Sequence, residues 1–545
     1  MMSSRFLRAC SAFLLAAVLA GCAAAPKQPP VPKLVVLLVV DGLPQRQVLA
    51  YRDQLAPDGF ARFLTRGAWF SQAHVAHAYT VTAAGHATFL TGAYPERTGI
   101  IGNDWRDRET GAPVYNTSDP AEHVIGQANE PLAGTSPRHL KVETVGDVLR
   151  RRDPRSKVIG ISGKDRGAIL PAGHDGTAYM YQDATGQFAS TTYYMREHPA
   201  WVRAFQAARP ADRFFHAEWN LLLPDAAYAA SVPFGAAWLG GARLPMTMGA
   251  ADRQPGPAYY KSLLASPFVD MMSLDFARAA IAGEQLGQDD APDILAVSLS
   301  GHDYVNHRWS AESRFSHDHL LRLDRMLQAF FAELDAKVGR DNYVAVLTAD
   351  HGFMPALPYL HERGIEGGRI VFADVVAHLN AGLSQRFGPG RWVLGNSASS
   401  LLLDKALPRE KGVDLDAVAD EARRLLLQEP GFAAAFTRRE LLSGSRAGEP
   451  LFDMLRRSWN ADVSGEVQYT VKPYWLFGAK TVGTHGSPYE YDTHIPILVY
   501  GPRWVRPARI DTPAEAVDIA PTLARLLHLP APAATQGRPL PLPAP

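Results

Sequence analysis

Four largely apolar runs along the chain each end in a cluster of polar side chains. The first, Leu34 to Val40, contains only Leu and Val, and the others cover residues 157–162, 294–299 and 343–347. Such runs are typical of strands buried on both faces, as in a parallel sheet. Ligands bind at the carboxyl edge of open α/β sheets, so we expect the polar residues after these runs to form a site.

A predicted helix separates the last two of these strands. Apolar residues recur every three or four positions from Leu320 to Val338, and Gly339 closes the pattern. Strand, helix and strand at this spacing predict an α/β fold, with a mostly parallel central sheet flanked by helices. Residues 495–500 predict a further strand, and residues 518–527 predict a helix capped by Asp518.

Two segments fit this alternation poorly. Residues 171–290 are rich in Tyr, Trp, Pro and Gly, and residues 355–480 carry one helical stretch, 413–429, among Gly-rich turns. We interpret both as insertions in a single catalytic domain of residues 34–540 that build the walls or lid of the site, since loops on a rigid sheet carry specificity. Peripheral packing is the alternative.

The N-terminus has the pattern of a secretory signal. Arg5 and Arg8 precede an apolar run, residues 13–20, that is too short to span a membrane, so residues 1–21 predict a signal peptide. The run ends in Leu-Ala-Gly-Cys22, which resembles a bacterial lipobox. That resemblance implies cleavage before Cys22 and a lipid anchor on its thiol, with residues 22–33 as a Pro-rich tether.

Ala23 after the cysteine implies the outer membrane of a Gram-negative bacterium, with the protein facing the periplasm. Ordinary cleavage after Ala25, giving a soluble periplasmic or secreted protein, is the alternative. The only other cysteine is Cys10, so the folded body has neither disulfides nor thiolate metal ligands.

Composition limits the class of partner. The 545 residues are 47% hydrophobic and carry formal net charge +0, which allows a large core and gives no electrostatic attraction to nucleic acid. We expect small-molecule substrates, no nucleic acid, membrane association only through the anchor, and a monomer.

Thr82 begins a predicted helix that Gly92 and Pro95 end. Free N–H groups and the dipole favour an anion at a helix N-terminus, so a hydroxyl there is a candidate nucleophile for phosphoryl or sulfuryl transfer. A simple capping role for Thr82 is the alternative.

The clusters after the strands contain carboxylates and imidazoles without cysteine, a donor set that suits zinc in catalytic sites. Asp303 and His307 are spaced for one helical turn or a tight loop. The remaining candidates are Asp41, Asp350, His351 and His485.

The motifs around these residues resemble the alkaline phosphatase superfamily, and within it the phosphate-irrepressible branch related to nucleotide pyrophosphatase/phosphodiesterases. They occur in family order over nearly the whole mature chain. They are Val-Asp41-Gly, Thr82-Ala-Ala-Gly-His, Gly-Asn103-Asp-Trp, Lys164-Asp-Arg166-Gly-Ala-Ile-Leu-Pro-Ala-Gly-His, Asp303-Tyr-Val-Asn-His307, Thr-Ala-Asp350-His351-Gly and Thr-His485-Gly-Ser.

The resemblance implies two zinc ions. One would be bound by Asp303, His307 and His485, and the other by Asp41, Asp350, His351 and the Thr82 oxygen, with Lys164 in place of a magnesium ion. Ala84 and the Gly301-His302 pair depart from the family pattern. Neither is at a ligand position, and His302 would affect only the residues that surround the metal ligands. We interpret three other histidines as packing or supporting residues: His86, His174 and His494.

The expected activity is zinc-dependent hydrolysis of phosphomonoesters of broad range. Thr82, activated by zinc, would attack phosphorus and form a phosphothreonine. Asn103, Lys164 and Arg166 would bind the non-bridging oxygens, and two cations favour a monoester dianion over a diester. The alternatives are a phosphodiesterase or nucleotide pyrophosphatase, a sulfatase, and a zinc-binding or adhesive lipoprotein without activity; a solvated turn is the alternative for Lys164 and Arg166.

Overall fold

The computed structural model describes residues 30–128 and 130–544. The predicted signal peptide, the lipid anchor at Cys22 and most of the tether lie outside these residues, so those predictions stay untested. Within the described residues, no helix combines the length and apolar character needed to cross a bilayer.

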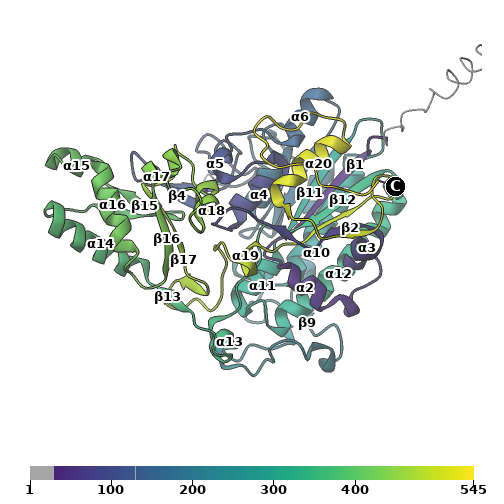
Figure 1. Cartoon of the computed structure of the whole chain (residues 1–545). Helices are drawn as coiled ribbons and strands as arrows, with labels where there is room; N and C mark the ends of the chain where they lie inside the picture. The colour runs from purple at the N-terminus through teal and green to yellow at the C-terminus, as the bar shows by residue number, and fades with distance from the viewer. Residues whose placement is uncertain (1–29, 129, 545) are drawn as a thin grey trace, which may run out of the picture. The chain divides into compact units, whose positions relative to one another are not determined.

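A nine-stranded mixed sheet, mostly parallel, forms the centre of the fold (Figure 1). Its inner strands β12, β1, β11, β6 and β7 are mutually parallel, and β19, β2, β20 and β8 complete its edges with three antiparallel pairings. The strands, in sheet order, are β20 (Ala508–Ile510), β2 (Ala68–Phe70), β19 (Ile497–Tyr500), β12 (Tyr343–Thr348), β1 (Leu34–Val40), β11 (Asp293–Leu299), β6 (Val158–Ser162), β7 (Thr177–Gln182) and β8 (Gln187–Ala189).

Helices pack in two groups against this sheet (Figure 1). The first group contains α4 (Thr82–Thr91), α5 (Pro95–Thr98), α6 (Val145–Arg152), α7 (Asp165–Ala172) and α20 (Ile519–Leu526). The second contains α3 (Phe60–Arg66), α8 (Ala200–Ala207), α10 (Pro267–Gly283), α11 (Gly301–Trp309) and α12 (Arg314–Leu334). Every residue of β1 is buried between them, which explains its unbroken run of Leu and Val.

The predicted α/β class, the four strands and the helix before β12 are confirmed. The helix is longer than its apolar pattern, because Ser313 caps it and accepts a hydrogen bond from the Ser316 N–H. Asp518 occupies the predicted N-cap position of α20, but the side-chain cap expected there is not formed. Its carboxylate accepts the N–H groups of Glu515 and Arg538, so it ties the helix entry to the C-terminal segment and makes no capping bond to α20.

Residues 171–290 take part in the sheet as well as in loops, because β7 and β8 belong to this range. Residues 355–480 form a separate four-stranded sheet in the order β14 (Val393–Ser397), β15 (Ser400–Leu403), β17 (Val467–Val471) and β16 (Phe432–Thr437). Helices α14 (Phe372–Phe387) and α16 (Leu415–Leu426) cover it with an apolar core of their own. The predicted wall or lid role stays a prediction.

Candidate active site and metal centre

The carboxyl ends of three neighbouring central strands bring most of the predicted ligands together. Asp41 follows β1, Asp350 and His351 follow β12, and Asp303 lies in the first turn of α11, directly after β11. Neighbouring strands are about 4.8 Å apart, so side chains at their ends reach one another. His485 comes from an irregular segment far along the chain, and its Nδ1 lies 2.8 Å from the Thr80 carbonyl oxygen.

One ligand set consists of Asp41, Asp350 and His351, all fully buried, with one ligand atom from each within 4.8 Å of the others. Nε2 of His351 lies 3.6 Å from Oδ1 of Asp41 and 3.5 Å from Oδ2 of Asp350. Its Nδ1 lies 2.8 Å from the Gly352 carbonyl oxygen, so Nδ1 donates to that oxygen and Nε2 is the ring atom that faces the carboxylates.

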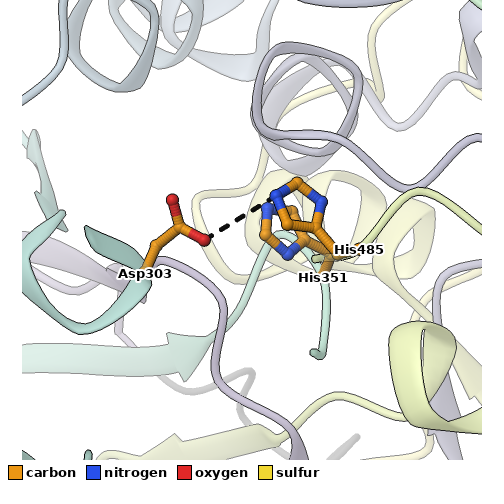
Figure 2. Close-up of side chains that lie close together, drawn as sticks. All are labelled: Asp303, His351 and His485. Atoms are coloured by element: carbon orange, nitrogen blue, oxygen red, sulfur yellow. Dashed lines mark ion pairs between the residues drawn. The ribbon is translucent and has the colours of Figure 1, made fainter. Parts of the chain in front are cut away.

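A second set consists of Asp303, His351 and His485, again within 4.8 Å of one another. Figure 2 shows the Asp303 carboxylate facing the two stacked imidazole rings, with Nε2 of His485 3.7 Å from its Oδ1. His307, one helical turn after Asp303, lies 3.4 Å from Oδ1 of Asp303 and 3.2 Å from Nε2 of His485. The two ligand sets therefore adjoin at His351.

The atoms of these sets fit divalent cations. Oδ1 of Asp41, Oδ1 of Asp303 and Nε2 of His351 are buried and have no hydrogen-bond partner among the described residues. Buried polar atoms are rarely left without a hydrogen-bond partner, so ligand atoms of this kind gathered in two adjoining sets are suited to bind cations. Burial, and after it the Asp350 charge, raise the pKa of Asp41 to about 7. Burial also holds the pKa of His485 well below its usual value, so its ring is neutral and able to ligate.

Lys164 lies between the two sets and not in a solvated turn. Its Nζ is 2.7 Å from Oδ2 of Asp41 and 2.6 Å from Oδ2 of Asp303, on the carboxylate oxygens turned away from the ligand positions. Burial lowers the pKa of Lys164, but the two carboxylates outweigh it and raise the pKa, so the ammonium stays charged. The contact with Asp303 is a hydrogen bond and the contact with Asp41 is an ion pair, and the ammonium also lies 4.8 Å from the centroid of the Tyr304 ring.

Thr82 is the first residue of α4, and Val81 is the capping position. No side-chain capping bond is made at the start of this helix, so the capping interpretation of Thr82 has no support among the described residues. Gly85 places the helix against Asp350, because a Cβ at Gly85 would lie 2.5 Å from the Asp350 carbonyl oxygen. Asn103 reaches the same point, since its Oδ1 accepts the N–H of Ala83 at 2.9 Å.

Arg166 lies in the first turn of α7, and its surroundings include two residues that the sequence did not single out. Its Nη1 donates to the Tyr115 hydroxyl at 3.1 Å, and the same hydroxyl donates to Oδ1 of Asp165 at 2.6 Å. Asp165 lies inside the Lys-Asp-Arg motif, so the sequence could have identified it as a candidate site residue. Tyr115 lies on a short ribbon fifty residues upstream, and no spacing pattern connects it to the motif.

The remaining histidines support other residues. His86 Nδ1 lies 3.2 Å from Oδ2 of Asp350, and its Nε2 contacts Ser298. His302 lies behind Asp303 in a buried chain to Gln47 and His319. The other two contact neither ligand set: His174 contacts Asp147, and His494 stacks on His74.

Comparisons with known proteins agree with this geometry. Residues 35–487 match the family model of type I phosphodiesterase / nucleotide pyrophosphatase. The chain is 35% identical to alkaline phosphatase PafA of Elizabethkingia meningoseptica, over 94% of each chain. It is 34% identical to alkaline phosphatase PhoV of Synechococcus elongatus, over 93% of this chain and 92% of the relative.

Solved structures show the same fold. The crystal structure of wild-type PafA superposes with a TM-score of 0.87 at 34% identity, over 94% of this chain and 99% of that chain. A phosphonoacetate hydrolase from Sinorhizobium meliloti, at 16% identity and a TM-score of 0.53, shares the fold alone. The chain therefore belongs to the type I phosphodiesterase / nucleotide pyrophosphatase family of the alkaline phosphatase superfamily, in its PafA-type branch.

Proposed function

We propose that this chain, an alkaline phosphatase, hydrolyses a broad range of phosphomonoesters with the hydroxyl of Thr82 as nucleophile. The observation that carries the proposal is the position of Lys164, a buried cation that forms an ion pair with one carboxylate of each ligand set. It brings a fixed positive charge to the edge of the sheet where α4 begins, the place where a phosphoryl dianion needs it.

Two zinc ions are the proposed cofactors. The donor set of carboxylates and imidazoles without thiolates suits this metal. One ion would take Asp41, Asp350, His351 and the Thr82 oxygen, and the other would take Asp303, His307 and His485. When bound, such a pair lowers the pKa of a coordinated oxygen and stabilises charge on the attacking and leaving oxygens.

The chain's own residues then have separate tasks. The Thr82 oxygen forms a bond to phosphorus as the bond to the leaving alcohol breaks, and the product is a phosphothreonine. Water then cleaves that phosphoester, which releases inorganic phosphate and restores the hydroxyl. Asn103, bonded to the N–H after Thr82, and the cations Lys164 and Arg166 bind the non-bridging oxygens.

The segment 355–480 supplies one wall of the substrate cavity in this proposal. A cavity of about 280 Å³ opens beside Asn103, His307 and His485, and its lining contains neither Lys nor Arg. Trp475 and Phe477 of strand β18 (Trp475–Phe477) face it from this segment. An uncharged, partly apolar leaving group therefore suits this side of the site, and the phosphoryl group suits the side with the cations.

A phosphodiesterase is the second candidate, because the family model that matches the chain bears that name. Purified mature protein is tested with p-nitrophenyl phosphate and bis-p-nitrophenyl phosphate, together with metal analysis. We expect about two zinc ions per chain and a higher kcat/KM for the monoester. A higher value for the diester would reverse the assignment.

The outer-membrane location, the anchor at Cys22 and the monomeric state remain proposals from the sequence. Mass spectrometry of the mature N-terminus tests the anchor: a lipid on Cys22 supports it, and an unmodified start at Pro26 contradicts it.

A further inference from the structure

The hydroxyl of Tyr115 lies between the two side chains that follow Lys164. It is 2.6 Å from Oδ1 of Asp165 and 3.1 Å from Nη1 of Arg166, while the direct distance from Nη1 to Oδ1 is 3.7 Å. The carboxylate and the guanidinium are therefore bridged by a phenol and kept out of direct hydrogen-bonding contact.

A phenol suits this place because it donates one hydrogen bond and accepts another. Asp165 is an acceptor only and Arg166 is a donor only, so the hydroxyl satisfies both at once. Burial and the Asp165 charge raise the pKa of the Tyr115 hydroxyl, which therefore keeps its proton. A phenylalanine would leave a gap in which the two opposite charges approach each other.

The carboxylate itself has little freedom. Its Oδ1 also accepts the backbone N–H of Arg166 at 2.7 Å. A Cβ at Gly134 would lie 1.8 Å from its Oδ2, so the chain passes directly over the other oxygen. Asp165 is therefore a fixed acceptor for the Tyr115 hydroxyl, which in turn accepts a hydrogen bond from the guanidinium. The Nε of Arg166 is buried without a partner among the described residues.

The same ribbon positions Asn103. Tyr115 ends β5 (Pro113–Tyr115), which pairs with β4 (Asp104–Arg106), and Tyr115 is the register partner of Asp104. Asn103 directly precedes β4, and its carbonyl accepts the side-chain amide of Asn116 at 2.7 Å. One end of the β4–β5 ribbon therefore serves both residues: β4 begins directly after Asn103, and β5 ends at Tyr115, which contacts Arg166.

We infer that Tyr115 is a positioning residue for Arg166, and that the β4–β5 ribbon fixes the spacing between Arg166 and Asn103 that the phosphoryl group requires. This inference rests on the proposed function, in which both groups bind the non-bridging oxygens. The preference for a dianionic substrate then depends partly on Tyr115, which contacts the Arg166 guanidinium and not the phosphoryl group.

The test compares Tyr115→Phe with the wild-type enzyme. We expect kcat/KM for p-nitrophenyl phosphate to fall roughly tenfold, the effect of losing one hydrogen bond to a charged group. Inhibition by inorganic phosphate should weaken by a similar factor, and kcat/KM for bis-p-nitrophenyl phosphate should change by less than about twofold. In an Arg166→Ala background, Tyr115→Phe should have no further effect on the monoester.

Tyr193→Phe is the matched control, since the Tyr193 hydroxyl donates to the His174 carbonyl outside both ligand sets. Equal losses for monoester and diester, or a full further loss in the Arg166→Ala background, would overturn the inference.

If Tyr115→Phe does not fold, the variant Asp165→Asn takes its place in the test, and the same selective loss of monoester activity is expected. Arg166→Ala alone tests the proposed function separately: an unchanged ratio of monoester to diester activity removes Arg166 from that function, whatever Tyr115 does.

Discussion

The Nζ of Lys164 lies 2.6 Å from Oδ2 of Asp303 and leaves Oδ1 of that carboxylate without a hydrogen-bond partner among the described residues. One oxygen of this carboxylate thus contacts the Lys164 ammonium, and the other is available to bind a metal ion. The same holds for Asp41, so a single lysine balances charge on both sides of the site.

Substitution of Lys164 and Arg166 should therefore change substrate preference. We expect the double variant Lys164→Ala/Arg166→Ala to lose at least about 100-fold in monoester kcat/KM and considerably less with a diester, which carries one negative charge fewer. Steady-state kinetics with both p-nitrophenyl substrates measure the difference. Lys157→Ala is the control, because Lys157 precedes the opposite end of β6 and pairs with Glu284.

Thr82→Ala should abolish the covalent intermediate without unfolding the protein. The Thr82 side chain makes no capping bond, and alanine is the best helix former, so the unfolding free energy should change by less than about 1 kcal/mol. Acid quenching during turnover, followed by peptide mass spectrometry, should find phosphothreonine in the wild type and none in the variant. Thr82→Ser should remain active and form a phosphoserine. Undiminished turnover by Thr82→Ala would show that Thr82 is not the nucleophile.

Removal of divalent cations should cost both activity and stability. Three buried carboxylates, Asp41, Asp303 and Asp350, would then lie close together without the metal charge, and the Lys164 ammonium pairs with only two of them. A ligand present at 100 times its Kd stabilises the folded state by about 2.7 kcal/mol per site, so chelation should lower the melting temperature by several degrees. Thermal denaturation with and without EDTA measures this, and zinc should restore both properties. A melting temperature that EDTA does not change would argue against these cation sites.

Trp475→Ala should affect substrates according to their leaving group. Because Trp475 lines the cavity beside His307 and His485, we expect KM to rise about fivefold for aryl phosphates. Methyl phosphate, whose leaving group does not reach this wall, should be unaffected. Trp238→Ala is the control, since Trp238 does not line this cavity. Equal increases for both substrates would contradict the wall role of this segment.

Acid should destabilise the fold through a histidine remote from the site. Burial lowers the pKa of His317 to about 4, and its ring lies between Tyr51, Ser231 and Gln54. The unfolded state has the ordinary pKa near 6.5 and binds the proton first, so stability falls as pH drops from about 6.5 to about 4, by up to about 3 kcal/mol.

His317→Gln should remove this part of the pH dependence. Urea unfolding at pH 7 and pH 4.5, in EDTA so that metal release does not contribute, measures it. His378→Gln, at an exposed position, serves as the control. Identical pH slopes for wild type and His317→Gln would exclude this origin.

The sequence by itself determined the parallel core and the ligands attached to it. β1, β11, β12 and β6 are recognisable because strands buried on both faces need continuous apolar residues, and their carboxyl ends place Asp41, Asp303, Asp350, His351 and Lys164 at one edge. The gap between Gly85 and Asp350, too narrow for a Cβ, agrees with the small residues that follow Thr82.

Only the tertiary structure decided how distant segments meet that edge. Nothing local indicates that the Thr80 carbonyl orients His485, that β19 runs antiparallel to β12, or that the Tyr115 hydroxyl bridges Arg166 and Asp165. Periodicity records which face of an element is buried, because burial requires apolar side chains. A hydrogen bond between residues far apart in the chain leaves no such pattern, since it depends on where two backbones come to lie in space.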